Sequence, residues 1–119
     1  MEFLVVVKRD CETCQLVEPV LAAMADAHSL TLYSQDDPTF PESLGGARDD
    51  HGLEQSWRYK IETVPTLLEI ENGQEVARTE GWDRVEWTRI TGMAALGEDL
   101  PAFRPGCGSR TMDPGVPEQ

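Results

Sequence analysis

Two cysteines, Cys11 and Cys14, are the residues of this sequence whose type and spacing point most directly to chemistry. Only Glu12 and Thr13 separate them, and they come soon after the apolar run Phe3–Val7. A C-x-x-C pair of this kind exchanges disulfides, contributes half of a metal site, or is buried as two small residues. The residues around the pair must distinguish these three interpretations.

The position of the pair favours disulfide exchange. The apolar run before it predicts a strand and residues 14–27 predict a helix, so Cys11 falls where unpaired N–H groups at a helix start stabilise a thiolate. Cys14 follows about one helical turn later. In this interpretation the Cys11 thiolate attacks a substrate disulfide as the nucleophile, and Cys14 resolves the mixed disulfide.

Metal binding is less well supported by the spacing of the remaining donors. A structural zinc site usually needs four ligands. Beyond the pair, only Cys107, His28 and His51 offer nitrogen or sulfur donors, and none of them repeats a paired spacing. No metal site is predicted, and metal handling through Cys11, Cys14 and Cys107 is an alternative.

Cys107 is a candidate auxiliary thiol. It lies in the glycine-rich stretch RPGCGSR, between Arg104 and Arg110. A thiol in such a segment is either reactive and exchanges with the Cys11–Cys14 pair, or is a tail cysteine without a role. The sequence leaves both interpretations open.

Charged residues close to Cys11 bear on the direction of the redox reaction. Asp10 and Glu12 flank it, and their negative charge disfavours its thiolate, whereas Lys8, Arg9 and the helix dipole act in the opposite sense. A less stabilised thiolate makes a dithiol a stronger reductant. The sequence therefore predicts a reducing couple. The acids between residues 35 and 50 are expected to form a solvated surface.

Hydrophobic patterns predict an α/β fold with the element order β-α-β-α-β-β-α. The strand over residues 2–8 is apolar without alternation, which indicates burial on both faces of a sheet. Residues 39–50 are rich in Pro, Gly and acids and are expected to form an exposed loop. The predicted sheet is central, four-stranded and mixed, with helices on its flanks. Its strands cover residues 2–8, 30–34, 66–70 and 75–79, and the helices cover 14–27, a short stretch around 53–61, and 83–96.

Short local signals define the ends and breaks of these elements. Asp10 is a plausible N-cap of the first helix, and Pro19 should kink that helix. Asp49 or Asp50 lies near the start of the second helix. Asn72-Gly73 predicts a tight hairpin, because both residues tolerate positive φ.

The last predicted helix has a recognisable start. Asp83 and Glu86 resemble a capping box, and Trp82 and Trp87 occupy the positions of a hydrophobic staple around it. Gly97 is expected to end this helix.

Together these landmarks resemble the thioredoxin family. The C-x-x-C pair follows the central strand, Pro19 lies five residues after the second cysteine, and Val64-Pro65-Thr66 comes about fifty residues later. The Asn72-Gly73 hairpin and Gly81 before the last helix complete the order. The similarity extends from residue 3 to residue 96.

The resemblance implies a thioredoxin-like fold in which the Val64–Pro65 peptide bond is cis and packs against the cysteines. It also implies that backbone groups of Val64 pair with a substrate strand, and that Thr63, Val64 and Pro65 shape the substrate groove. The implied activity is thiol–disulfide exchange on protein disulfides, with no bound cofactor. Electrons would come from a separate thiol reductase or a small-thiol donor.

Two positions depart from the family pattern. Asp10 precedes the first cysteine where thioredoxins usually have Trp, and Val5 replaces the family's buried acid. These departures favour an alternative class of function, a thioredoxin-fold binding or adaptor module whose cysteines turn over little.

Composition restricts the partners and the organisation of the chain. The 119 residues suit one domain, predicted at 1–97 and followed by an irregular Gly/Pro-rich tail at 98–119. A formal charge of −12 argues against nucleic-acid partners and against anionic membranes. No apolar run is long enough for a membrane span, and the N-terminus does not resemble a secretory signal. The expected location is cytoplasmic.

Overall fold

The computed structural model describes residues 2–115 and has an α/β architecture built on a mixed sheet. Within these residues the main sheet has five strands in the order β3-β2-β1-β5-β6. β2 is parallel to β1 and to β3, whereas β5 is antiparallel to β1 and to β6. The strands are β1 (Glu2–Val7), β2 (Ser29–Ser34), β3 (Arg48–Asp49), β5 (Thr66–Glu71) and β6 (Gln74–Glu80).

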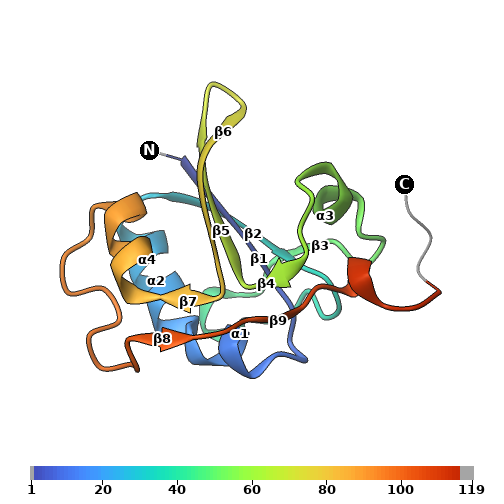
Figure 1. Ribbon diagram of the computed structural model, residues 1–119, viewed down its shortest axis with the longest axis horizontal. Helices are drawn as coiled ribbons and strands as arrows, with labels where there is room; N and C mark the ends of the chain where they lie inside the picture. Colours follow the sequence, from blue (N-terminus) through green and yellow to red (C-terminus); the bar gives the residue numbers. More distant parts are fainter. Residues whose placement is uncertain (1, 116–119) are drawn as a thin grey trace.

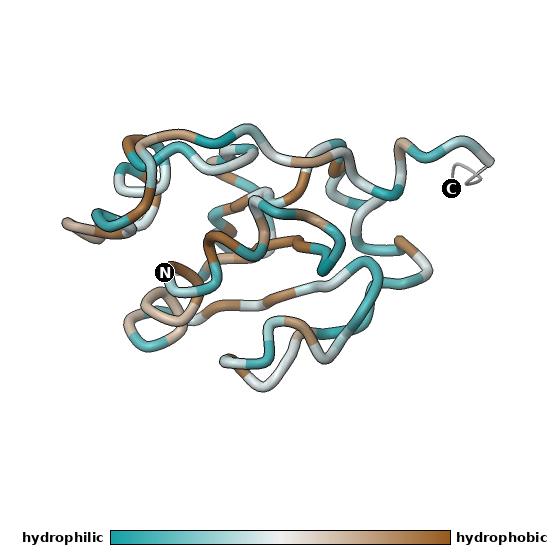
Figure 2. Tube along the Cα trace, turned by 90° about the horizontal axis from the view of Figure 1, so that it is seen from below, coloured by the Kyte–Doolittle hydropathy of each residue, from teal (hydrophilic) through white to brown (hydrophobic). Residues whose placement is uncertain are grey.

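The central strand β1 is buried on both faces, as its unbroken apolar sequence predicts. The five residues from Phe3 to Val7 are each at most 6 % exposed. Val5 lies between Leu32 of β2 and Leu67 of β5 in the register of the sheet. Figure 2 shows the hydrophobic stretches gathered in the inner strands and the hydrophilic ones in the outer loops. β1 therefore forms the middle of the core and ends next to Cys11.

Helices cover the sheet on both sides. Figure 1 shows α2 and α4 together on one side and α3 on the other. Within residues 2–115, no helix combines the length and apolar character needed to cross a membrane. The helices are α1 (Glu12–Leu16), α2 (Glu18–Ala27), α3 (Glu54–Arg58) and α4 (Arg84–Thr91).

The break predicted at Pro19 divides the first helical region into two helices. α1 ends at Leu16, Val17 lies between the two helices, and α2 begins with Glu18 and carries Pro19 in its first turn. A proline is tolerated there because the first N–H groups of a helix have no intrahelical partner.

The prediction of four strands is wrong by one, because β3 forms inside the segment expected to be an exposed loop. Arg48 and Asp49 pair with Tyr33 and Ser34 of β2. Both residues of β3 are exposed, so no apolar alternation marks them as a strand. Only the backbone pairing with β2 defines this element.

The start of α4 agrees with its sequence signals. The Asp83 carboxylate caps the helix by accepting the backbone N–H groups of Val85 and Glu86. The rings of Trp82 and Trp87 pack with their centroids 5.4 Å apart, which confirms the predicted staple.

The predicted end of α4 is wrong, because the helix stops before Gly97. Gly92 adopts a left-handed conformation with φ 69°, and its N–H donates to the Thr88 carbonyl at 2.8 Å. This glycine cap ends the helix at Thr91, since a left-handed residue cannot continue it. The Asn72-Gly73 hairpin is confirmed, with φ values of 53° and 78°.

The C-terminal segment, residues 98–115, lies across the body of the protein and pairs with it twice. Figure 1 shows this orange-to-red segment running past α1 and beside β4. β8 (Phe103–Arg104) pairs with β7 (Trp82–Asp83), and β9 (Cys107–Gly108) pairs with β4 (Thr63–Val64).

A buried amide anchors the far end of the C-terminal segment. The Gln35 side chain donates to the hydroxyls of Ser56 and Ser109 at 2.8 Å each and accepts the Arg110 backbone N–H at 2.9 Å. The Thr111 hydroxyl donates to the Ile61 carbonyl at 2.7 Å. These bonds join the segment to β2 and to the region around α3.

Aromatic and guanidinium groups anchor the near end of the segment. The Trp82 indole N–H donates to the Pro101 carbonyl at 2.7 Å, and the Arg84 backbone N–H donates to the Ala102 carbonyl at 3.0 Å. The Arg84 guanidinium also donates to the carbonyls of Gly97 and Leu100. The stretch between these two anchors crosses the cysteines.

Asp50, rather than Asp49, holds the start of α3. Its carboxylate is 3 % exposed and accepts the backbone N–H groups of Gln55 and Ser56 at 2.9 Å, together with the Ser56 hydroxyl at 2.6 Å. Asp49 is exposed and accepts only the N–H of His51 at 2.8 Å among the bonds of the described residues.

We expect Asp50→Ala to lower the free energy of unfolding by about 1–3 kcal/mol, because it leaves buried donors without an acceptor. Asp49→Ala is the matched control and should stay within about 0.5 kcal/mol of the wild type. Chemical denaturation of the reduced protein measures both values. Equal losses in the two variants would contradict the role of Asp50.

Candidate functional site

Cys11 and Cys14 lie together where β1 ends and α1 begins. Cys11, and not Asp10, is the N-cap of α1, and its sulfur accepts the backbone N–H of Cys14 at 3.3 Å. Asp10 lies one residue before the cap, and its backbone N–H donates to the Asp36 carboxylate at 3.0 Å. Cys11 is 3 % exposed and Cys14 is fully buried.

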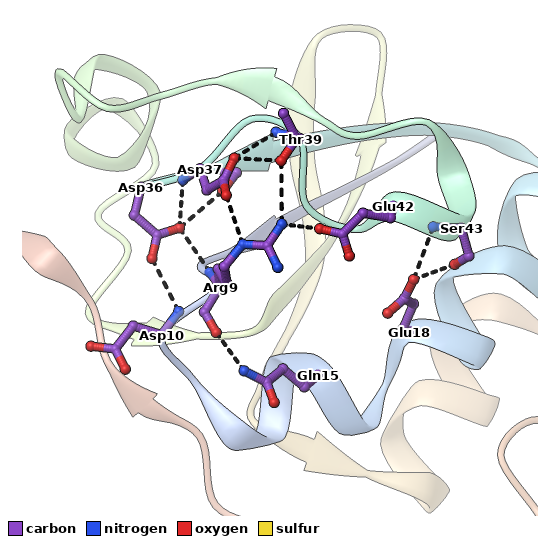
Figure 3. A network of polar contacts seen from close by, with 10 residues as sticks. Arg9, Asp10, Gln15, Glu18, Asp36, Asp37, Thr39, Glu42 and Ser43 are labelled. Atoms are coloured by element: carbon purple, nitrogen blue, oxygen red, sulfur yellow. Dashed lines mark hydrogen bonds and ion pairs between the residues drawn. The ribbon is translucent and has the colours of Figure 1, made fainter.

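A polar cluster fixes the loop that leads into the cysteines (Figure 3). The Asp36 carboxylate accepts the backbone N–H groups of Arg9 at 2.7 Å and of Asp10 at 3.0 Å. The Arg9 guanidinium pairs with Asp37 at 2.7 Å and with Glu42. These three acids were expected to be solvated surface, so the sequence did not reveal their role in the site.

The charge on Asp36 is stabilised by the loop that it holds. Partial burial alone would raise the pKa of this carboxyl. Hydrogen bonds from the backbone N–H groups of Arg9, Asp10 and Asp37 together outweigh that effect, so the pKa is lowered. Asp36 thus provides a negative charge that holds Arg9 and Asp10, the two residues directly before Cys11.

The Val64–Pro65 turn meets Cys11, as the family resemblance implies. The peptide bond between Val64 and Pro65 is cis, and the Cys11 thiol donates to the Val64 carbonyl at 3.5 Å. The Thr63 carbonyl faces inward and accepts the Thr66 hydroxyl at 2.6 Å. Thr63 and Val64 form β4, so the predicted groove residues and the predicted nucleophile are adjacent.

Cys107 reaches the same place from the C-terminal segment. In the β4–β9 pair it stands opposite Val64, the residue whose carbonyl contacts Cys11. The Thr13 hydroxyl donates to the Pro105 carbonyl at 2.7 Å, and the Lys8 ammonium donates to the Gly108 carbonyl at 2.9 Å. The structure therefore brings all three cysteines into one cluster.

The three thiols have different acidities. The hydrogen bond from Cys14 outweighs burial and lowers the pKa of Cys11 to about 6, with a further contribution from Cys107. Burial and the neighbouring Cys11 raise the pKa of Cys14 well above its ordinary value. Burial and Cys11 also raise the pKa of Cys107. One thiolate, on Cys11, is thus favoured at neutral pH.

This result is the opposite of what the flanking acids predict. Asp10 and Glu12 were expected to disfavour the Cys11 thiolate, but they are exposed, and hydrogen bonds from the neighbouring thiols act at shorter range. Local hydrogen bonding thus has more effect on Cys11 than the formal charge of its sequence neighbours.

The donor set gives little support to metal handling. Across residues 2–115, no group of three or more His, Cys, Asp or Glu side chains is arranged to hold a metal ion. His28 lies elsewhere, with its ring 5.1 Å from the ring of Phe3, and His51 is exposed.

Glycine residues allow the C-terminal segment to approach the site, and the sequence analysis missed this role. A Cβ on Gly106 would lie 2.5 Å from the Val64 oxygen and 2.5 Å from Thr63 Cγ2. Gly81 has a φ of 70°, and a Cβ there would lie 2.8 Å from the Gly106 nitrogen. The G-C-G triplet around Cys107 was the available signal for a close backbone contact.

Comparison with known proteins adds no identification. No protein-family model matches this chain, and no curated protein matches its sequence.

We expect Cys11 to titrate near pH 6 in the reduced protein, with Cys14 and Cys107 titrating above their ordinary value of 9.0. NMR titration of the cysteine Cβ resonances measures all three. Because the folded pKa of Cys11 is depressed, its contribution to stability is absent below pH 6, grows as the pH rises, and is complete above pH 9.0. A Cys11 midpoint above that of Cys107 would contradict this assignment.

Proposed function

We propose that the protein is a thiol–disulfide oxidoreductase of thioredoxin-like fold that reduces protein disulfides through Cys11 and Cys14. One observation carries the proposal: the Cys11 sulfur accepts the Cys14 N–H at 3.3 Å, and the pKa values of the two thiols shift in opposite directions. A nucleophile needs a thiolate at neutral pH, and a resolving thiol must stay protonated until the mixed disulfide has formed.

The proposed reaction has two steps. The Cys11 thiolate attacks one sulfur of a substrate disulfide, and the other sulfur leaves as a thiolate that takes up a proton. Cys14 then loses its proton and attacks Cys11, which releases the second substrate thiol and leaves a Cys11–Cys14 disulfide. The substrate gains two electrons and the dithiol loses two, so a separate thiol reductase or a small-thiol donor must restore the reduced form.

Proton loss from Cys14 needs a route other than a buried carboxylate. Val5, which replaces the acid of the thioredoxin pattern, is fully buried in the core. The backbone N–H of Lys8 contributes a hydrogen bond that favours the Cys14 thiolate. In the proposed mechanism the departing substrate thiolate is the base that takes this proton.

The stabilised Cys11 thiolate removes the argument for a strong reductant that the flanking acids gave, so the reducing direction is proposed from a comparison with known couples. The nucleophilic cysteine of thioredoxin has a pKa of about 7 and that of the strong oxidant DsbA about 3.5. The value of about 6 in this chain lies closer to that of the reductant. The proposal therefore includes a cytoplasmic location, where such dithiols are kept reduced.

A binding or adaptor module with little turnover is the second candidate. The observation that favours it is the burial of both thiols, because Cys11 is 3 % exposed and Cys14 is 0 % exposed. An oxidoreductase of this structure must uncover Cys11 before it meets a protein substrate, whereas a binding module need not.

Reduction of insulin disulfides by dithiothreitol distinguishes the two candidates. We expect the wild type to accelerate the reaction and Cys11→Ser to fall to the rate of dithiothreitol alone, because the attacking thiolate is lost. The double variant Cys14→Ser/Cys107→Ser, which has no second thiol to attack Cys11, should form a lasting mixed disulfide with the insulin chain, visible by mass, when dithiothreitol is left out. Asp49→Ala, which changes only an exposed carboxylate, is the control and should match the wild type.

The oxidoreductase proposal fails if the wild type does not accelerate insulin reduction and forms no Cys11–Cys14 disulfide in a glutathione redox buffer. With normal folding, these two results together would move the assignment to the binding module.

A further inference from the structure

The C-terminal segment occupies the strand position that the proposed function reserves for a substrate. Backbone groups of β4 are the ones expected to pair with a substrate strand, and β9 already pairs with them. In that pairing Cys107 stands opposite Val64, beside the nucleophilic sulfur. A cysteine of this chain therefore lies where a substrate cysteine would be presented.

The C-terminal segment approaches β4 closely because backbone atoms, and not side chains, make the contact. At Gly106 there is no room for a Cβ, which would lie 2.5 Å from both the Val64 oxygen and Thr63 Cγ2. Real Cβ atoms do not approach other atoms this closely, so a side chain at this position would displace the segment. At Gly108, on the other side of Cys107, a Cβ would meet nothing within 4 Å.

Hydrogen bonds hold the Cys107 stretch on both sides of the thiol. Pro105 is fixed by the Thr13 hydroxyl at 2.7 Å, and Gly108 is fixed by the Lys8 ammonium at 2.9 Å. One residue further, the Ser109 N–H donates to the Glu62 carbonyl at 2.9 Å. The position of Cys107 is therefore specified by the fold rather than left to a free tail.

We infer that Cys107 is a third redox-active thiol, which forms an intramolecular disulfide with Cys11 while β9 occupies the substrate strand's place on β4. The inference rests on the proposed function in one respect, that Cys11 is the reactive thiolate.

The disulfide forms by exchange and needs no further oxidant. Once turnover has left a Cys11–Cys14 disulfide, the Cys107 thiolate attacks the Cys11 sulfur. The Cys11–Cys14 bond breaks, the Cys11–Cys107 bond forms, and the Cys14 sulfur leaves as a thiolate that takes up the proton lost by Cys107. The same attack resolves a mixed disulfide between Cys11 and an outside thiol, and that thiol is then released.

The electrostatic contacts between the two thiols agree with this assignment. Hydrogen bonds from the side chain and the backbone N–H of Cys107 are among the causes that lower the pKa of Cys11. Backbone N–H groups of Glu12 and Thr13 in turn act on the Cys107 sulfur. Cys107 thus interacts with the same turn of backbone that positions Cys11.

Oxidised glutathione and the variant Cys14→Ser test the inference directly. Glutathione first forms a mixed disulfide with Cys11, and Cys107 should then displace it, so that one glutathione disulfide yields two glutathione thiols and one Cys11–Cys107 bond. We expect mass spectrometry of the intact protein to show no lasting adduct, and non-reducing peptide mapping to show the Cys11–Cys107 link. The double variant Cys14→Ser/Cys107→Ser should retain the glutathione adduct.

Two glycine variants in the Cys14→Ser background separate docked exchange from random encounter. Gly106→Ala should slow formation of the Cys11–Cys107 bond by about tenfold or more, because it removes the segment from β4 and lowers the effective concentration of Cys107. Gly108→Ala should react at the parent rate. Circular dichroism and chemical denaturation establish that both variants fold.

The outcomes are distinct from those of the proposed function. A lasting glutathione adduct on Cys11 in Cys14→Ser, or equal rates in the two glycine variants, would overturn the inference even if insulin is reduced normally. Formation of the Cys11–Cys107 bond with the expected glycine dependence would support it even if insulin is not reduced, in which case only the proposed function fails.

Discussion

The burial of β1 on both faces is the constraint on which the rest of the structure depends. A strand whose five residues Phe3–Val7 are all apolar needs a partner strand on each edge and helices on each face. Once it is covered in this way, its carboxyl end can only emerge at the edge of the core. Cys11 ends the short loop that follows Val7, and its sulfur caps α1. The location of the proposed nucleophile is thus a consequence of core packing.

The two neighbouring cysteines lower the pKa of Cys11, through their thiols first and through their backbone N–H groups second. The Cys11 sulfur also lies between the Cys14 N–H and the Val64 carbonyl, while the Asp36 carboxylate holds the preceding loop. The lowered pKa of Cys11 therefore depends on the positions of Cys14 and Cys107, and no carboxylate is among its causes. The absence of an acid at Val5 is compatible with such a site.

Much of the fold is predictable from the sequence because its main elements have local signals. The two-sided apolar pattern of β1, the positive-φ pair Asn72-Gly73 and the staple of Trp82 and Trp87 each involve neighbouring residues, and each is confirmed. Two-residue strands such as β3 and β9 have no period to detect, and their partners lie far away along the chain. The contact between Cys107 and the Cys11 site therefore cannot be predicted from the sequence and is found only in the folded structure.

The close contact between Gly81 and Gly106 has an evolutionary consequence. Each glycine lies where a Cβ would meet the backbone of the other region, so neither position tolerates a side chain while the C-terminal segment is docked. Among descendants of this chain, both positions are expected to stay glycine while the segment is docked, and Gly81 is constrained in addition by its positive φ of 70°. Docking of the C-terminal segment over Cys11 thus depends on two glycines, because every other amino acid would place a Cβ atom in the contact.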